Sequence, residues 1–203
     1  RYEVWPHKSL ATNTFVPAGT THLAVSALEV TVDQHGIFES DELLPGHPFV
    51  ACVPTSAAPP TLPEDIRRQH LTTPYDLEFE REDSDGYKIK QLADRLFLNC
   101  HSTDEKIAAV KKYFTSNYEY RLSIRIPANQ EPLTYFLLDK PAAHCEYFAT
   151  GATILLRLGG VPSRYVTGFV TTERNQVGGY WVARNRDAHA WVEAFDEQDG
   201  WVT

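Results

Sequence analysis

The segment that most constrains the fold runs from residue 145 to residue 162 and reads CEYFATGATILLRLGGVP. Its apolar residues recur at the spacing of a helix face: Phe148, Ala149, Ala152, Leu155 and Leu156. The pair Gly159-Gly160, followed by Val161-Pro162, is a strong stop signal for a helix. The sequence therefore predicts an apolar helix with Cys145 at its first turn.

Strand-like runs follow this helix. They read SRYVTGFVTT, GGYWVARN and AHAWVEAF, and the last turns through DEQDG into WVT. A helix followed by an antiparallel sheet predicts an α+β core. In the third run, alternation places polar residues on one face, namely Asp187, His189, Trp191 and Glu193. The other face is small and apolar, so we expect it to pack on the core of the sheet. The face with His189 would then look toward the helix of Cys145.

The region before residue 145 contains further helix signals. Ile89, Leu92, Ala93, Leu96 and Phe97 form one apolar face of a helix. Ser102 and Glu105 form a capping-box pattern that opens a second helix. The run PEDIRRQ predicts a short helix, and YEYRLSIRIP predicts an extended segment.

Residues 1–58 are rich in β-branched residues and in Pro and Gly, which predicts strands; alternation is clear in AVSALEVTVD, through Val25, Ala27, Glu29 and Thr31. Residues 54–86 contain several prolines and an acidic run, and we interpret them as a connector. We expect a β-rich accessory region over residues 1–86, with a sandwich-like arrangement as the candidate, and the α+β core over 87–203.

Charge excludes one class of partner. The chain has 19 basic and 27 acidic residues and a net charge of −8. Its basic residues form no cluster larger than pairs such as Arg67-Arg68 and Lys111-Lys112, whereas nucleic acid and anionic membranes need a concentrated basic face.

The longest apolar run, ATILL, is cut by Arg157 and is too short to span a membrane. Because the chain begins at Arg1, we expect it to be a piece of a longer protein, and membrane contact would need a segment of that parent. Cytoplasmic and envelope-facing locations both stay open.

The cysteines point away from a metal site. Cys52, Cys100 and Cys145 have no C-x-x-C spacing, so we predict neither a zinc site nor another cofactor. A disulfide between Cys52 and Cys100 is the alternative to two buried free thiols.

Cys145 is a candidate nucleophile, with His189 as its candidate base. A thiol attacks carbonyl carbon as the thiolate, and a helix N-terminus and a nearby imidazole both favour that form. The structural alternatives are a buried cysteine and a hydrogen-bonded strand histidine. His144 is adjacent to the cysteine, but neighbours on a helix point about 100° apart, so we expect it to line the cleft or to be solvated.

The run CEYFATGATILLRLGGVPSRYVTGF, followed by DAHAWVEAF and GWV, resembles the bacterial transglutaminase-like domain, a papain-like α+β fold. The resemblance covers residues 87–203. It implies that Cys145 is the nucleophile and His189 the general base and acid. The acid of the triad follows the Trp-Val strand in this family as Trp-Val-x-x-Asp, which places it just after Thr203. Asp187 is the internal alternative. One departure is Ala-Ala-His-Cys before the helix, where relatives often have Gly-x-Cys.

The same resemblance suggests roles for four more residues. The backbone N–H of Cys145 and the side chain of Tyr120 are candidate oxyanion donors, although Tyr120 could equally be a buried strand tyrosine. Trp191 and Tyr180 are candidates for cleft walls or core. Arg164 is expected to anchor the turn after the helix through hydrogen bonds.

The implied reaction is acyl transfer from a protein or peptide amide through a thioester, with a glutamine donor and an amine acceptor as in transglutaminases. A cysteine peptidase, amidase or deamidase with water as acceptor is the alternative. A protein-binding domain of the same fold without catalysis is the third candidate.

Overall fold

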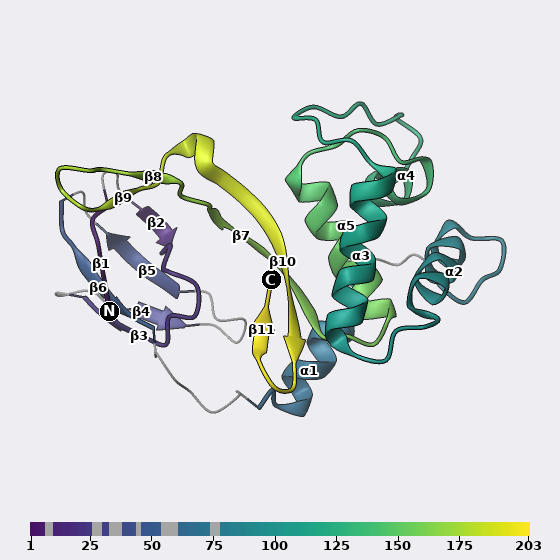
Figure 1. The fold of residues 1–203 in the computed structure, drawn as a ribbon, viewed down its shortest axis with the longest axis horizontal. Coiled ribbons are helices and arrows are strands. Elements are labelled where there is room, and N and C mark those ends of the chain that lie inside the picture. The colour runs from purple at the N-terminus through teal and green to yellow at the C-terminus, as the bar shows by residue number, and fades with distance from the viewer. Residues whose placement is uncertain (7–9, 26–29, 33–37, 44–45, 54–60, 74–77) are drawn as a thin grey trace. The chain divides into compact units, whose positions relative to one another are not determined.

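The computed structural model divides into two compact units, residues 1–58 and residues 59–203 (Figure 1). It describes residues 1–6, 10–25, 30–32, 38–43, 46–53, 61–73 and 78–203. The contacts group residues 59–86 with the second unit, and the short helix predicted in that stretch is present as α1 (Glu64–Leu71).

The described residues of the first unit form two antiparallel three-stranded sheets. One has the order β1-β6-β3, from Tyr2–Val4, Phe49–Cys52 and His22–Ala24. The other has the order β2-β5-β4, from Leu10–Asn13, Phe38–Leu43 and Val30–Val32. The predicted β character is therefore present. Of the alternating run from Val25 to Thr31, residues 26–29 lie outside the described residues.

In the described part of the second unit, four more α-helices follow α1. They are α2 (Asp85–Phe97), α3 (Thr103–Asn117), α4 (Pro132–Asp139) and α5 (Cys145–Leu158). The sequence predicted all of these except α4, which is short and lacks a clear apolar period. Glu131 caps α4 by accepting hydrogen bonds from the backbone N–H groups of Leu133 and Thr134, at 3.1 and 2.7 Å.

The capping pattern before α3 is present in the structure. Ser102 is the N-cap, and its Oγ accepts a hydrogen bond from the N–H of Glu105 at 3.2 Å. The Glu105 carboxylate accepts from the backbone N–H of His101, and its pKa is lowered first by that bond and also by a hydrogen bond with the backbone of Ser102. The helix start is therefore fixed by two side chains, as the pattern indicated.

The sheet of the second unit has the order β11-β10-β7 and is antiparallel, from Gly200–Val202, Ala188–Asp196 and Ser163–Phe169. The predicted strand GGYWVARN does not join it. Only β9 (Trp181–Val182) forms there, and it pairs with β8 (Glu173–Arg174) in a separate hairpin between β7 and β10. Its glycines and polar flanks leave it without an apolar face that the sheet could bury.

Helix α5 packs along the sheet, mainly against β10, so the predicted α+β core with its cysteine helix on an antiparallel sheet is confirmed (Figure 1). Ser163 Oγ donates a hydrogen bond to the carbonyl of Thr153 in α5 at 3.1 Å, and Ser163 pairs in register with Ala194. Paired residues share a face, so α5 covers the small apolar face of β10.

At Glu193 and Phe195, the polar face of β10 lies on the opposite side of the sheet from α5. The expectation that this face looks toward the cysteine helix is therefore wrong there. Helix α1 contributes to its cover: the Arg67 guanidinium lies 5.9 Å from the centre of the Phe195 ring, and His70 meets Trp201 edge-on at 4.9 Å. The physical reason is size, because the alanines let a helix approach the sheet closely.

Candidate active site

Cys145 is the first residue of α5 and is partly buried. All three cysteines are free, so no disulfide joins Cys52 to Cys100. Just before the helix, Ala143 forms a parallel bridge with Tyr120. The N–H of Ala143 donates to the carbonyl of Glu119 at 3.1 Å, and the N–H of Arg121 donates to the carbonyl of Ala143 at 2.8 Å. This bridge fixes the extended segment of Tyr120 beside the start of α5.

Tyr120 and Cys145 interact directly. The pKa of the Tyr120 phenol is raised, first by desolvation, then by the charge of Cys145 and by a hydrogen bond with its side chain. A hydrogen bond with the backbone of Cys145 acts in the opposite direction. The phenol is therefore close to both the thiol and the backbone of Cys145, although Tyr120 is 54% exposed. A hydroxyl that lies beside a thiol at a helix N-terminus gives a geometry that can hold an oxyanion.

His144 is the N-cap residue of α5 and not part of the helix, so its direction is not set by helical spacing as the sequence argument assumed. Its Nε2 lies 3.3 Å from a carboxylate oxygen of Glu146, and its ring meets Tyr147 edge-on at 5.1 Å. Its Nδ1 is buried without a hydrogen-bond partner among the described residues. His144 therefore lies beside the nucleophile in contact with an acid and an aromatic ring.

His189 is the second residue of β10, exposed at the end of the strand, and it pairs in register with Gly168 of β7. Within the described ranges it makes no hydrogen bond or ion pair with Cys145 or with an acid. The packing of α5 on β10 brings the two elements of the predicted pair together, but among the described residues no hydrogen bond joins the two side chains. Catalytic hydrogen bonds are often long without substrate.

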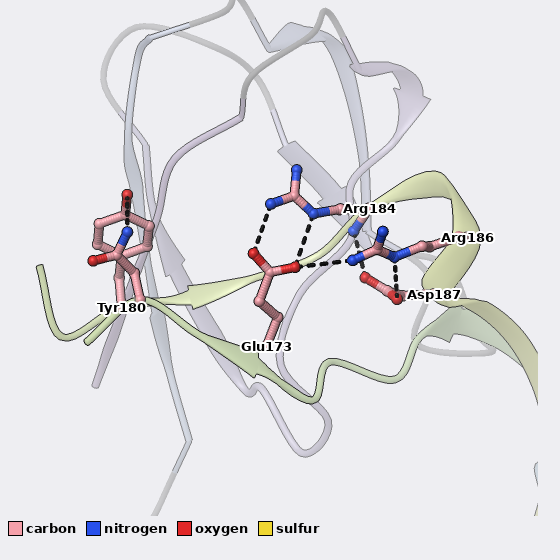
Figure 2. A network of polar contacts seen from close by, with 6 residues as sticks. Glu173, Tyr180, Arg184, Arg186 and Asp187 are labelled. Carbon is pink, nitrogen blue, oxygen red and sulfur yellow. Dashed lines mark hydrogen bonds and ion pairs between the residues drawn. The ribbon is translucent and has the colours of Figure 1, made fainter. Parts of the chain in front are cut away.

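Asp187 does not lie on the strand, which begins at Ala188. It closes a 3₁₀ turn, η1 (Asn185–Asp187), where its Oδ2 accepts from the N–H of Arg184 at 2.8 Å. The carboxylate of Glu173 faces the guanidinium groups of Arg184 and Arg186 (Figure 2). Its Oε1 lies 2.6 Å from Nη2 of Arg184, and its Oε2 lies 3.0 Å from Nη2 of Arg186. We call Glu173, Arg184, Arg186 and Asp187 the turn cluster. It ties the β8–β9 hairpin to the residues immediately before His189.

Tyr180 lies in the same hairpin and is exposed. Its hydroxyl accepts a hydrogen bond from Nδ2 of Asn175 at 3.1 Å (Figure 2). The structure places it in a surface hairpin beside the turn cluster. The Tyr180 ring is therefore held by a contact within the hairpin itself.

The sequence missed a buried polar network on β10. Glu193 is 8% exposed, and its Oε2 accepts from Nε and Nη2 of Arg164 at 2.9 and 2.7 Å. Nε1 of Trp191 donates to Oε1 of Glu193 at 3.3 Å, and the Arg164 guanidinium lies 4.2 Å from the centre of the Trp201 ring. The signal was the alternation that placed Trp191 and Glu193 on one face.

The turn after α5 is anchored by Arg157, and Arg164 pairs with Glu193 on β10. Nε and Nη2 of Arg157 donate to the carbonyl of Ser163 at 3.0 and 2.8 Å, and Nη1 donates to the carbonyl of Thr72. Burial lowers the pKa of the Arg157 guanidinium. The helix position of Arg157 lets it reach back to the turn, whereas Arg164 points across the sheet.

The described part of the chain contains no group of three His, Cys, Asp or Glu side chains that could hold a metal ion. Its helices include none with the length and apolar character needed to cross a membrane.

Comparison with known proteins shows which family this chain is related to. The family model of the transglutaminase-like superfamily core matches residues 90–203. The chain is 33% identical over 129 residues to uncharacterized protein YebA of Bacillus subtilis, and 28% identical over 117 residues to a protein-glutamine gamma-glutamyltransferase of Pseudomonas aeruginosa. These matches cover 60% and 57% of this chain but 17% of each relative, so the chain spans about a sixth of their length.

The crystal structure of the periplasmic domain of TgpA from Pseudomonas aeruginosa superposes with a TM-score of 0.70 at 20% identity. It covers 98% of this chain and 68% of that one, which shows a common fold across nearly all of the chain. The cysteine at the start of α5, the strand of His189 and the match over residues 90–203 agree with one another. The chain therefore belongs to the transglutaminase-like superfamily.

Proposed function

We propose that this chain catalyses cysteine-dependent acyl transfer on protein or peptide amides, with Cys145 as the nucleophile and His189 as general base and acid. A glutamine side chain would be the acyl donor and an amine the acceptor, as the name of the Pseudomonas relative suggests. The observation that carries this proposal is the place of the Cys145 thiol at the start of α5, where the bridge between Ala143 and Tyr120 holds the Tyr120 phenol beside it.

In the proposed reaction the Cys145 thiolate attacks the carbonyl carbon of the glutamine amide, and the carbonyl oxygen takes up the negative charge. The Cys145 N–H and the Tyr120 hydroxyl donate to that oxyanion. Imidazolium at His189 gives its proton to the leaving nitrogen, the C–N bond breaks, and ammonia leaves a thioester. An amine then attacks the thioester, His189 takes its proton, and the thiolate departs.

The third member of the triad stays a prediction. Strand β11 runs antiparallel to β10, with Val202 opposite Ala194, so its direction leads back toward the end of β10 that carries His189. An acid just after Thr203 would approach His189 if that ladder continued. Asp187 is less suited to the role because its carboxylate already closes the η1 turn and lies 3.8 Å from Nε of Arg186.

The test combines thiol reactivity with turnover, on the present chain and on one extended past Thr203. Alkylation of each cysteine by iodoacetamide is followed against pH by mass spectrometry, for wild type, Cys145→Ala, His189→Ala and the control Cys100→Ala. We expect Cys145 alone to react well below pH 8, and His189→Ala to remove that reactivity. Cys145 that titrates like an ordinary thiol in both chains would refute the proposal.

Turnover is measured with a glutamine-containing peptide and a fluorescent primary amine. Incorporation of the amine, lost in Cys145→Ala and kept in Cys100→Ala, supports transglutaminase activity. Release of ammonia or peptide cleavage without incorporation identifies water as the acceptor. If the peptide binds without any turnover and Cys145 is unreactive, the result supports the third candidate, a protein-binding domain of the same fold without catalysis.

A further inference from the structure

Gly168 lies where a side chain would otherwise stand next to His189. The two residues are register partners on β7 and β10, and directly opposed residues in antiparallel strands share a face with Cβ atoms about 5 Å apart. At Gly168 the backbone is not in a left-handed conformation, so turn geometry does not explain the glycine.

The space above Gly168 is filled by the indole of Trp191. A Cβ at position 168 would lie 2.8 Å from Cη2 and 3.2 Å from Cζ3 of that ring. The first distance is shorter than real Cβ contacts allow, so alanine at this position would force the ring to move. The ring therefore lies over the register partner of His189 only because residue 168 has no side chain.

The other end of the indole is held in place. Nε1 of Trp191 donates to Glu193, whose carboxylate is fixed by two hydrogen bonds from Arg164, and Arg164 in turn lies over the ring of Trp201. Because Glu193 is 8% exposed, the anchor of the indole is shielded from solvent. Trp191 is thus fixed at its Nε1 and bounded at its far edge by the backbone of Gly168.

We infer that Trp191, seated on Gly168, is a positioning residue for His189: the ring forms a wall that restricts the imidazole to the orientation in which it serves Cys145. This inference rests on the proposed function. His189 is exposed and makes no hydrogen bond in the described part of the chain, and Trp191 is its neighbour two residues along the same face of β10. An acid from beyond Thr203 would add a second restraint.

The test uses Gly168→Ala and the matched control Gly178→Ala. A Cβ at Gly178 would likewise meet an aromatic ring, at 2.4 Å from Cε1 of Tyr180, but in the exposed β8–β9 hairpin. The readout is the pH profile of Cys145 alkylation, with circular dichroism to verify the fold. We expect Gly168→Ala to shift the profile about one pH unit toward that of His189→Ala, which is about tenfold slower reaction at low pH, and Gly178→Ala to leave it unchanged.

Two further variants keep the test decisive. Trp191→Phe empties the space over Gly168 and should shift the profile in the same direction, which serves if Gly168→Ala does not fold. The double variant Gly168→Ala/Trp191→Phe puts a methyl group where the larger ring stood, so it should lie closer to wild type than either single variant. Folded single variants with the wild-type profile overturn the inference while His189→Ala still shifts it. If His189→Ala shifts nothing, the proposed function fails and this role fails with it.

Discussion

Replacing Arg164 with methionine tests whether the buried network on β10 is held by charge. Methionine keeps a flexible apolar stem against the Trp201 ring and removes both hydrogen bonds to Glu193. The carboxylate would stay nine-tenths buried, with Trp191 as its partner in the described network. Breaking a buried ion pair costs about 3–5 kcal/mol. Because the Arg164 side chain is 28% exposed, water can reach part of the vacated space, and we expect a cost of about 2–3 kcal/mol.

This cost corresponds to a fall in the melting temperature of the second unit of about 5–10 °C, measured by circular dichroism. The control is Arg174→Met, because Arg174 also lies over a tryptophan, Trp181, at 5.9 Å but in the exposed hairpin. We expect it to cost about 0.5 kcal/mol. A loss below about 1 kcal/mol for Arg164→Met would refute the reasoning.

Three other changes have defined outcomes. Leu155 is fully buried in the core, so Leu155→Ala should cost about 3 kcal/mol in urea unfolding, and a cost under about 1 would contradict the packing. Ser102→Ala should cost about 1 kcal/mol in the same assay, because the N–H of Glu105 loses its cap. The pKa of Glu173 is lowered, first by its hydrogen bond with Arg184, so its contribution is present at neutral pH and is lost as the pH falls through the lowered pKa. Glu173→Gln should therefore speed amide hydrogen exchange at residues 184–189 at pH 7 and have less effect in acid. Equal exchange rates in wild type and variant at pH 7 would contradict the role of Glu173 in the turn cluster.

Local sequence was enough for the helices with strong periodicity and for their ends. The stripe of α2, the Ser102 cap of α3 and the glycine stop of α5 act within a few residues, so they need no knowledge of the rest of the chain. Helix α4 was missed because its cap is a glutamate and its eight residues carry no clear period. The predicted strand GGYWVARN is longer than the observed β9, because β-branched and aromatic residues alone do not decide whether a sheet accepts a strand.

The sequence by itself determined the α+β order, the place of Cys145 at a helix start and the place of His189 on a strand, because each follows from the period of side chains along one element. Only the tertiary structure decided which face of β10 meets α5, that Tyr120 comes to the thiol through its bridge to Ala143, and that Trp191 rests on Gly168. These are relations between segments distant in the chain. They depend on which side chains are small enough to let two elements approach, and that is settled when the elements pack.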